Sequence, residues 1–225
     1  MRRRMAAMAA GLVLLMTTGC AAEAEPQGDA LYAAGEERYT AFATGLHDVL
    51  MTVHDQTWDV KQNDYGAAPI SCPGSGGYFF QALRRATPSD ADATDLERRA
   101  REALEALDLE VTSSVLGSGD RQEYNVVGVG GVFERVVVAI QVASGSVLVT
   151  AKSTCAPGSA PELGDLVFAD STARDQWRLL PATEGPDSVP QFYFPPDGPV
   201  YYDEAGDPIQ PQPVVTDPPV APYGG

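Results

Sequence analysis

From Leu109 onward, apolar residues alternate with polar ones along the chain. Alternation of this kind over about 4–8 residues is typical of a β-strand that buries one face. Glycine, serine and aspartate turns divide the stretch into four expected strands: Leu109–Leu116, Gln122–Gly128, Val132–Val142 and Val147–Cys155. Strands joined by such short connections form an antiparallel meander, and its apolar face requires a cover.

The last turn of the meander predicts a register. If Ser144-Gly145 forms a two-residue turn, Val142 faces Val147 on the apolar side of the hairpin. The next pairs on that side are also apolar: Ile140 with Val149, and Val138 with Ala151.

The preceding hairpin cannot follow the same rule. A two-residue turn at Gly130-Gly131 would set Val136 opposite the polar Asn125. A shift by one residue sets Val136 opposite Tyr124 instead, so we expect a glycine bulge at this turn.

Two segments with helical periodicity precede the meander. The first is expected to begin with Asp29 as its N-cap and to end near Asp55, and the second to begin at a Thr94/Glu97 capping box. Each places its apolar residues on one side: Tyr39, Phe42, Leu46, Val49, Leu50 and Val53 in the first, and Leu96, Ala100, Ala103, Leu104 and Leu107 in the second.

An extended segment is expected to begin with Trp58 and Val60, and a further strand is expected from Tyr78 through Leu83 with Arg84 and Arg85 at its end. The predicted fold class is therefore α+β. An antiparallel sheet of about five or six strands is covered on one face by two amphipathic helices, within a domain spanning residues 29–156.

The beginning of the chain has the pattern of an export signal. Three arginines, Arg2 to Arg4, precede the apolar run Ala6–Met16, which is too short to span about 30 Å of hydrocarbon. The run leads into Thr17-Thr18-Gly19-Cys20, which resembles the lipobox of bacterial lipoproteins. That resemblance implies a signal peptide of residues 1–19, a Cys20 that carries palmitate-type acyl chains, and a linker of residues 20–28.

Two other interpretations of this segment stay open. It can be a plain secretory signal cleaved after Ala21 or Ala22, or an uncleaved membrane anchor. Under each of the three, the folded part lies on the extracytoplasmic side of the cell membrane.

The charge of the chain excludes one class of partner. Removing residues 1–19 takes away three of the 15 basic residues and none of the 31 acidic ones, which leaves a net charge of −19. A surface this acidic repels nucleic acid and anionic lipid, so we expect no nucleic-acid partner.

The remaining cysteines form an even pair. With Cys20 lipidated, Cys72 and Cys155 are left in an oxidising compartment, and we expect a disulfide between them. Two free thiols or a metal site are the alternatives, and neither cysteine lies in a C-x-x-C pattern or near a histidine.

His47 and His54 are the only histidines in the sequence and are weak candidates for a metal or acid–base site. Each precedes an aspartate on the first predicted helix, at a spacing of two helical turns. That spacing separates the two imidazoles by about 10 Å, too far for both to bind one ion without other ligands. We therefore expect no metal, no other cofactor and no assigned catalytic residue.

The chain beyond the meander changes in composition. Residues 157–180 contain two short apolar patches and are expected to pack on the domain as an extension. Residues 181–225 hold 12 of the 18 prolines and seven acidic residues but no lysine or arginine, so they predict a disordered acidic tail.

The order of these features resembles that of lipoproteins of high-GC Gram-positive bacteria, the LppA-like kind. The resemblance covers about residues 20–156 and rests on the lipobox, the two helices, the strand meander ending at Ser153-Thr154-Cys155, and the cysteine pair. It implies a fold and a location, since such proteins have no assigned activity.

Three functions remain open at this stage. The first is a noncatalytic, envelope-associated module that binds an envelope protein or a small ligand. The second is a hydrolase or metal-dependent enzyme using His47 and His54, which no nucleophile, lysine or zinc motif supports. The third is a structural spacer that extends toward the cell wall.

Overall fold

The structure is a computed structural model that describes residues 25–60, 67–74, 76–89, 92–167 and 183–187. It confirms an α+β fold with an antiparallel sheet and one disulfide. The lipobox, residues 168–182 and the tail from residue 188 lie outside the described residues. The helices are α1 (Gly28–Val53), α2 (Ala93–Ala106) and α3 (Ala160–Val167), and the strands are β1 (Trp58–Val60), β2 (Ile70–Ser71), β3 (Tyr78–Phe79), β4 (Gln81–Ala86), β5 (Glu110–Leu116), β6 (Glu123–Gly130), β7 (Phe133–Gln141), β8 (Val147–Ser153) and β9 (Thr183–Glu184).

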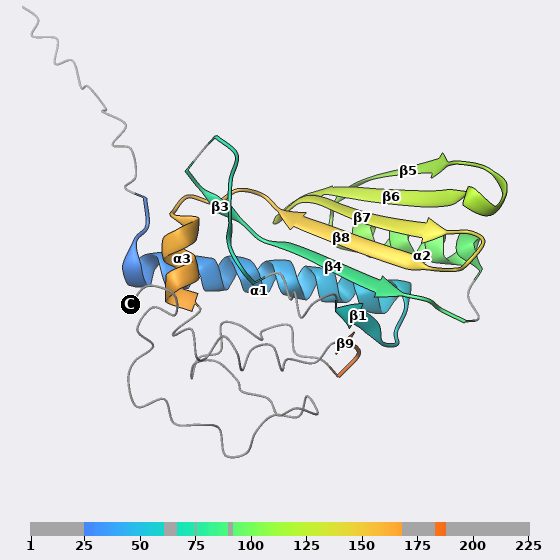
Figure 1. Cartoon of the computed structure of the whole chain (residues 1–225), viewed down its shortest axis with the longest axis horizontal. Coiled ribbons are helices and arrows are strands. Elements are labelled where there is room, and N and C mark those ends of the chain that lie inside the picture. The colour runs from blue at the N-terminus through green and yellow to red at the C-terminus, as the bar shows by residue number, and fades with distance from the viewer. Residues whose placement is uncertain (1–24, 61–66, 75, 90–91, 168–182, 188–225) are drawn as a thin grey trace, which may run out of the picture.

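The main sheet has seven strands, slightly more than the sequence predicts. Their order is β5-β6-β7-β8-β4-β1-β9, so the meander β5 to β8 forms one side, and β4, β1 and the late strand β9 complete the other. Strands β5 and β9 therefore lie at opposite edges, as Figure 1 shows. The short strands β2 and β3 pair separately as a two-stranded ribbon.

The core lies between the sheet and the helices. Helices α1 and α2 lie on one face of the sheet, and α3 packs against α1 near its N-terminal end (Figure 1). All six apolar positions expected on α1 are buried, as are Leu96, Ala100, Ala103 and Leu104 of α2. Opposite them, the same face of the sheet buries Trp58, Val126, Val136, Val138, Ile140, Val147, Val149 and Ala151.

The helix starts differ from the capping signals in the sequence. The N-cap of α1 is Gln27 and that of α2 is Asp92, and neither side chain makes a capping hydrogen bond. The predicted cap at Asp29 and the predicted capping box at Thr94 are therefore wrong. Tertiary structure replaces the first of them, because the Gly28 N–H donates to Glu162 Oε1 of α3 at 2.8 Å.

The predicted pairing of the β7–β8 hairpin is shifted by two residues, but it places the correct side chains on the apolar face. Ile140 pairs with Val147, because the loop has four residues rather than two and is closed by a hydrogen bond from the Gly145 N–H to the Gln141 carbonyl. A shift of two residues keeps every side chain on the same face. The predicted apolar side is therefore also the observed one.

The β6–β7 hairpin contains the expected bulge but turns one residue later. Gly130 pairs with Phe133, and the register shifts between Gly128 and Gly130. Val136 is consequently opposite Gly128 instead of Tyr124, a difference of four residues that again preserves the face. Gly131 has a φ of +54°, which favours glycine at the turn.

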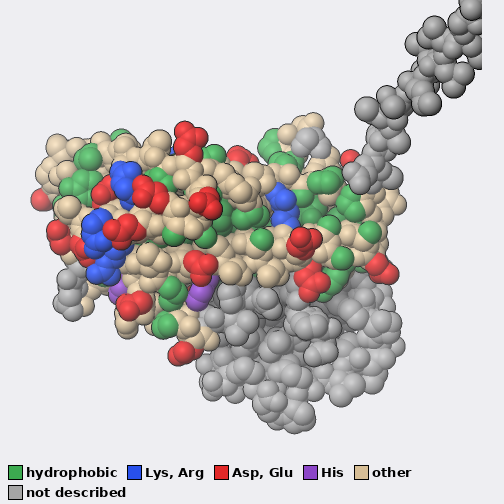
Figure 2. Space-filling view, turned by 180° about the vertical axis from the view of Figure 1, so that it is seen from behind, with side chains coloured by type: hydrophobic (Ala, Val, Ile, Leu, Met, Phe, Trp, Pro, Cys, Tyr) green, Lys and Arg blue, Asp and Glu red, His purple; other side chains and the backbone are tan. Residues whose placement is uncertain are grey.

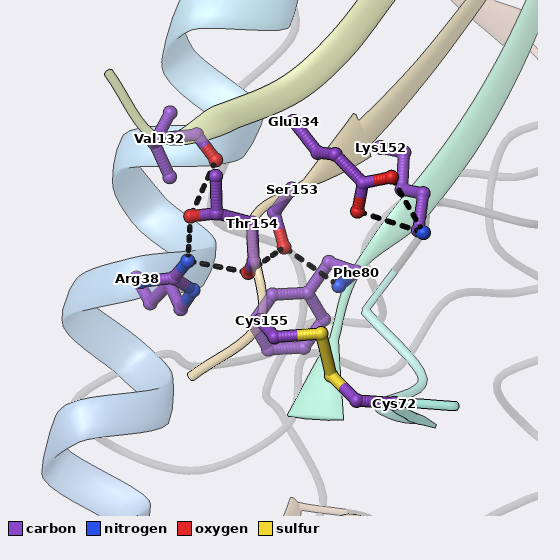
Figure 3. Close-up of a disulfide and its surroundings, with 9 residues drawn as sticks. All are labelled: Arg38, Cys72, Phe80, Val132, Glu134, Lys152, Ser153, Thr154 and Cys155. Carbon is purple, nitrogen blue, oxygen red and sulfur yellow. Dashed lines mark hydrogen bonds and ion pairs between the residues drawn. A yellow bond between two sulfur atoms is a disulfide. The ribbon is translucent and has the colours of Figure 1, made fainter. Parts of the chain in front are cut away.

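The predicted disulfide between Cys72 and Cys155 is present, with the two Cα atoms 6.2 Å apart. It joins the end of β2 to the segment that follows β8 (Figure 3). Nearby, the Arg38 guanidinium of α1 donates to the Thr154 carbonyl and hydroxyl oxygens, and the Phe80 N–H donates to Ser153 Oγ at 2.9 Å. The bond thus lies where a helix, the ribbon and the sheet meet.

Within the described ranges, none of the helices combines the length and apolar character that a bilayer span requires.

Candidate functional site

A buried group of charged side chains joins α1, β4 and β9. Glu184 accepts hydrogen bonds from His47 Nδ1 at 2.8 Å and from Arg84 Nε at 2.5 Å. The Arg84 and Glu184 side chains are only 3% and 4% exposed, and His47 is 13% exposed. The alternation of β4 places Arg84 on the helix-covered face, between Ala82 and Ala86.

The charges in this group compensate one another. Burial alone raises the pKa of Glu184, but the hydrogen bond from His47 and the charge of Arg84 outweigh it and hold that pKa below its ordinary value. Glu184 is therefore an ionised partner for the Arg84 guanidinium and a hydrogen-bond partner for the His47 ring. Its position fixes β9 against the sheet.

The sequence missed two members of this group. Arg84 was expected at the end of a strand, and Glu184 within the disordered tail from residue 181. The structure instead places Arg84 inside β4 and Glu184 in β9, paired with Trp58 of β1. The alternation of β4 sets Arg84 on the same side as Ala82 and Ala86, and that pattern could have indicated that Arg84 is buried. It could not indicate the partner, because Glu184 is 100 residues away in the sequence.

The second histidine lies apart from this group. His54 follows the C-terminal end of α1, where its ring packs edge-on against Trp58, and burial lowers its pKa. The Trp58 indole N–H donates to the His54 carbonyl at 2.9 Å. The described ranges contain no group of three or more histidine, cysteine or acidic residues able to hold a metal ion.

A shallow groove of about 680 Å³ runs along the outward side of α1. Small residues and Leu107 form its floor, and Glu36, Glu37 and Asp48 are among its lining residues. It lies on the helix-covered side of the molecule shown in Figure 2, where arginine and acidic side chains gather over α2.

The other face of the sheet has no helix over it within the described residues. We call it the open face and define it by the half-exposed row that crosses four strands in register: Val127 of β6, Val137 of β7, Thr150 of β8 and Leu83 of β4. The neighbouring row, Asn125, Ala139, Leu148 and Arg85, extends it.

The open face is more apolar than a solvated sheet face usually is. An antiparallel sheet with one wet face alternates apolar and polar residues, whereas strands covered on both faces have continuous apolar runs. Strand β7 contains Val136, Val137 and Val138 in sequence, and β6 contains Val126 and Val127. These strands have the composition of strands covered on both sides.

Two arginines flank the apolar row. Arg85 and Arg135 are exposed, and neither forms a hydrogen bond or ion pair with the described residues. Lys152, on the same face, is paired with Glu134 at 2.7 Å and lies over the Phe79 ring. The open face is therefore an apolar centre with a charged border.

No protein-family model, no curated protein and no solved structure matches this chain.

Proposed function

We propose that the mature chain is a noncatalytic binding protein, held by acyl chains on Cys20 at the extracytoplasmic face of the cell membrane. It binds another envelope protein through the open face of its sheet. The carrying observation is the half-exposed row of Val127, Val137, Thr150 and Leu83, which lies on the face of the sheet turned away from both helices.

The cysteine chemistry supports the anchor. Cys72 and Cys155 bond to each other, which leaves Cys20 as the third cysteine of the sequence and free to carry lipid. Two or more acyl chains are required for stable attachment, because each buried methylene contributes about 0.8 kcal/mol. Helix α1 begins at Gly28, so the linker holds the domain within about 30 Å of the bilayer.

The shape of the open face favours a protein over a small molecule as its partner. Small ligands bind in concave pockets that bury most of their surface, and the groove described above lies along α1, on the other side of the molecule from the open face. An apolar centre with a polar border is the usual anatomy of a protein interface. Arg85 and Arg135 add binding sites for carboxylates at that border.

The anchor is tested by mass spectrometry of native protein purified from membranes. We expect the N-terminal peptide to begin at Cys20 and to carry the added mass of acyl chains. A Cys20→Ala variant should leave the membrane fraction. Recovery of unmodified Cys20, or of residues 1–19 still attached, would overturn the anchor.

The binding surface is tested by affinity capture from intact envelopes after mild cross-linking. A Val137→Asp variant places a charge at the centre of the open face and should lose the captured protein. Thr44→Asp, an exposed position in the α1 groove, is the matched control and should retain it. Thermal unfolding by circular dichroism establishes that both variants fold, and equal capture by both would refute the assignment.

A further inference from the structure

We propose that two copies of this chain pair through the outer edge of β5 and form one continuous antiparallel sheet. Strand β5 is the last strand in the sheet order and pairs only with β6 among the described residues. Alternate N–H and C=O groups of such a strand point away from the sheet, where another strand can pair with them. The inference concerns this edge and is separate from binding at the open face.

The β5 edge lacks the features that normally prevent strand addition. Proteins protect their edges with lysine, proline, a bulge or a very short strand. Strand β5 has seven residues, contains no lysine, arginine or proline, and pairs with β6 without a register shift. By contrast, β9 at the opposite edge has two residues.

Exposed apolar side chains gather at the same edge. Val115 is 56% exposed and Leu116 is 55% exposed, both on β5, and Val129 on the adjacent strand is 46% exposed. Ile70 is the other large apolar side chain exposed to this degree among the described residues. Two of these four, Val115 and Leu116, therefore lie on the edge strand itself, where a second sheet would join.

The sequence of β5 is complementary to itself. In an antiparallel pair centred on Ser113, all seven residues of the two strands are matched. Val111 is then opposite Val115 of the second copy on the helix-covered side, and Thr112 is opposite Ser114 on the other side. Glu110, the single charged residue of the strand, is opposite Leu116, so no like charges meet.

The surroundings of Ser113 suit a twofold axis at this position. Arg101 Nη2 of α2 donates to Ser113 Oγ at 2.6 Å, and Ser113 Oγ donates to Glu97 Oε1 at 2.9 Å. Each copy thus brings one positive and one negative charge to the axis. The local charges balance, although the sequence as a whole has a net charge of −16.

This pairing has a defined architecture. A twofold axis between antiparallel strands is perpendicular to the sheet, so both open faces lie on one side and all helices on the other. The dimer would present one binding surface twice as wide. Because the copies repel each other at long range, their association should strengthen when salt is added.

Single-cysteine cross-linking tests the pairing and its register in membranes that contain the mature full chain. Ser113→Cys should form a disulfide-linked dimer on mild oxidation, because directly opposed residues have Cα atoms about 4.5–5.5 Å apart. Thr112→Cys and Ser114→Cys should cross-link poorly alone and well when co-expressed. Ser144→Cys, an exposed loop position, controls for random collision.

A charge at the edge tests the interface without changing its backbone. Val115→Lys should weaken dimerisation at least tenfold by sedimentation equilibrium in detergent. Val129→Lys, which makes the same charge change at similar exposure one strand away, should leave it unchanged. Repetition at about 0.05 M and about 0.5 M NaCl should show tighter association in the higher salt.

The proposal is overturned by a folded S113C protein that forms no dimer, by equal effects of the two lysine variants, or by an S113C adduct with a different protein. These outcomes are separate from failure of the proposed function. Lipid on Cys20 and capture through Val137 can stand without the dimer, and the dimer can form without either.

Discussion

At the scale of single residues, Glu184 is the side chain that holds β9 against the sheet. It is buried, it bonds to His47 and Arg84, and its pKa lies below the ordinary value for glutamate. A carboxylate with a lowered pKa contributes stability above its unfolded pKa, and that stability is lost as the pH falls toward the folded pKa. Acid should therefore release β9 from the sheet.

Replacing Glu184 by glutamine should lower the free energy of unfolding at neutral pH by about 3 kcal/mol, because the buried Arg84 guanidinium then faces a neutral amide where the Glu184 carboxylate stood. Urea unfolding measures the change. The difference from wild type should shrink as the pH falls from about 7 to about 3. Glu134→Gln, which breaks the exposed pair with Lys152, is the control and should cost less than about 1 kcal/mol.

Two helical glycines provide a second test at this scale. A Cβ on Gly45 of α1 would lie 2.9 Å from the buried Phe133 ring, whereas a Cβ on Gly164 of α3 would lie 3.7 Å from the Pro69 side chain. Gly45→Ala should therefore destabilise the protein by about 1–3 kcal/mol through overpacking. Gly164→Ala should stabilise it by up to about 1 kcal/mol, since alanine favours helix. Thermal unfolding measures the stability change of each variant, and two changes of the same sign would contradict this account.

At the scale of elements, the disulfide reinforces a junction that backbone hydrogen bonds between Tyr78 and Ala156 also connect. Cys72 and Cys155 are separated by 83 residues, and the bond ties the β2–β3 ribbon to the end of β8. A C72A/C155A double variant should lose up to about 4–5 kcal/mol, the chain-entropy value for a loop of this length. Denaturant unfolding should show this loss, and wild type in strong reductant should behave like the variant.

The elements also show which features the sequence could predict. The apolar positions of α1 and the faces of β7 and β8 were predictable, because burial follows a period of 3.6 or 2. The hairpin registers were wrong by two and four residues, because loop length is not determined by that pattern. The start of α1 was not predicted correctly, because the acceptor for its first N–H comes from α3, which is distant in the sequence.

The candidate site was less predictable than the fold. The valine runs of β6 and β7 are visible in the sequence, but only the sheet order reveals that one of their faces has no helix over it among the described residues. The contact between Arg84 and Glu184 depends on β9 joining β1 at the sheet edge. A strand of two residues within a proline-rich segment has no signal of its own.

At the scale of the whole molecule, the two sides of the sheet have different roles in the proposed function. One side buries the core beneath α1 and α2 and accounts for stability. The other has an apolar row that adds nothing to that core, together with Arg85 and Arg135. A chain anchored at Cys20 would present this second side to proteins of the same membrane.

Site-specific photo-cross-linking in intact cells tests most directly whether the open face binds an envelope protein. A photoreactive phenylalanine analogue replaces Thr150, at the centre of the open face, or Thr44, in the α1 groove, as the control. We predict that the Thr150 position yields one discrete adduct with another envelope protein and that the Thr44 position does not. An adduct only with the chain's own tail, or no adduct at Thr150, would contradict the account.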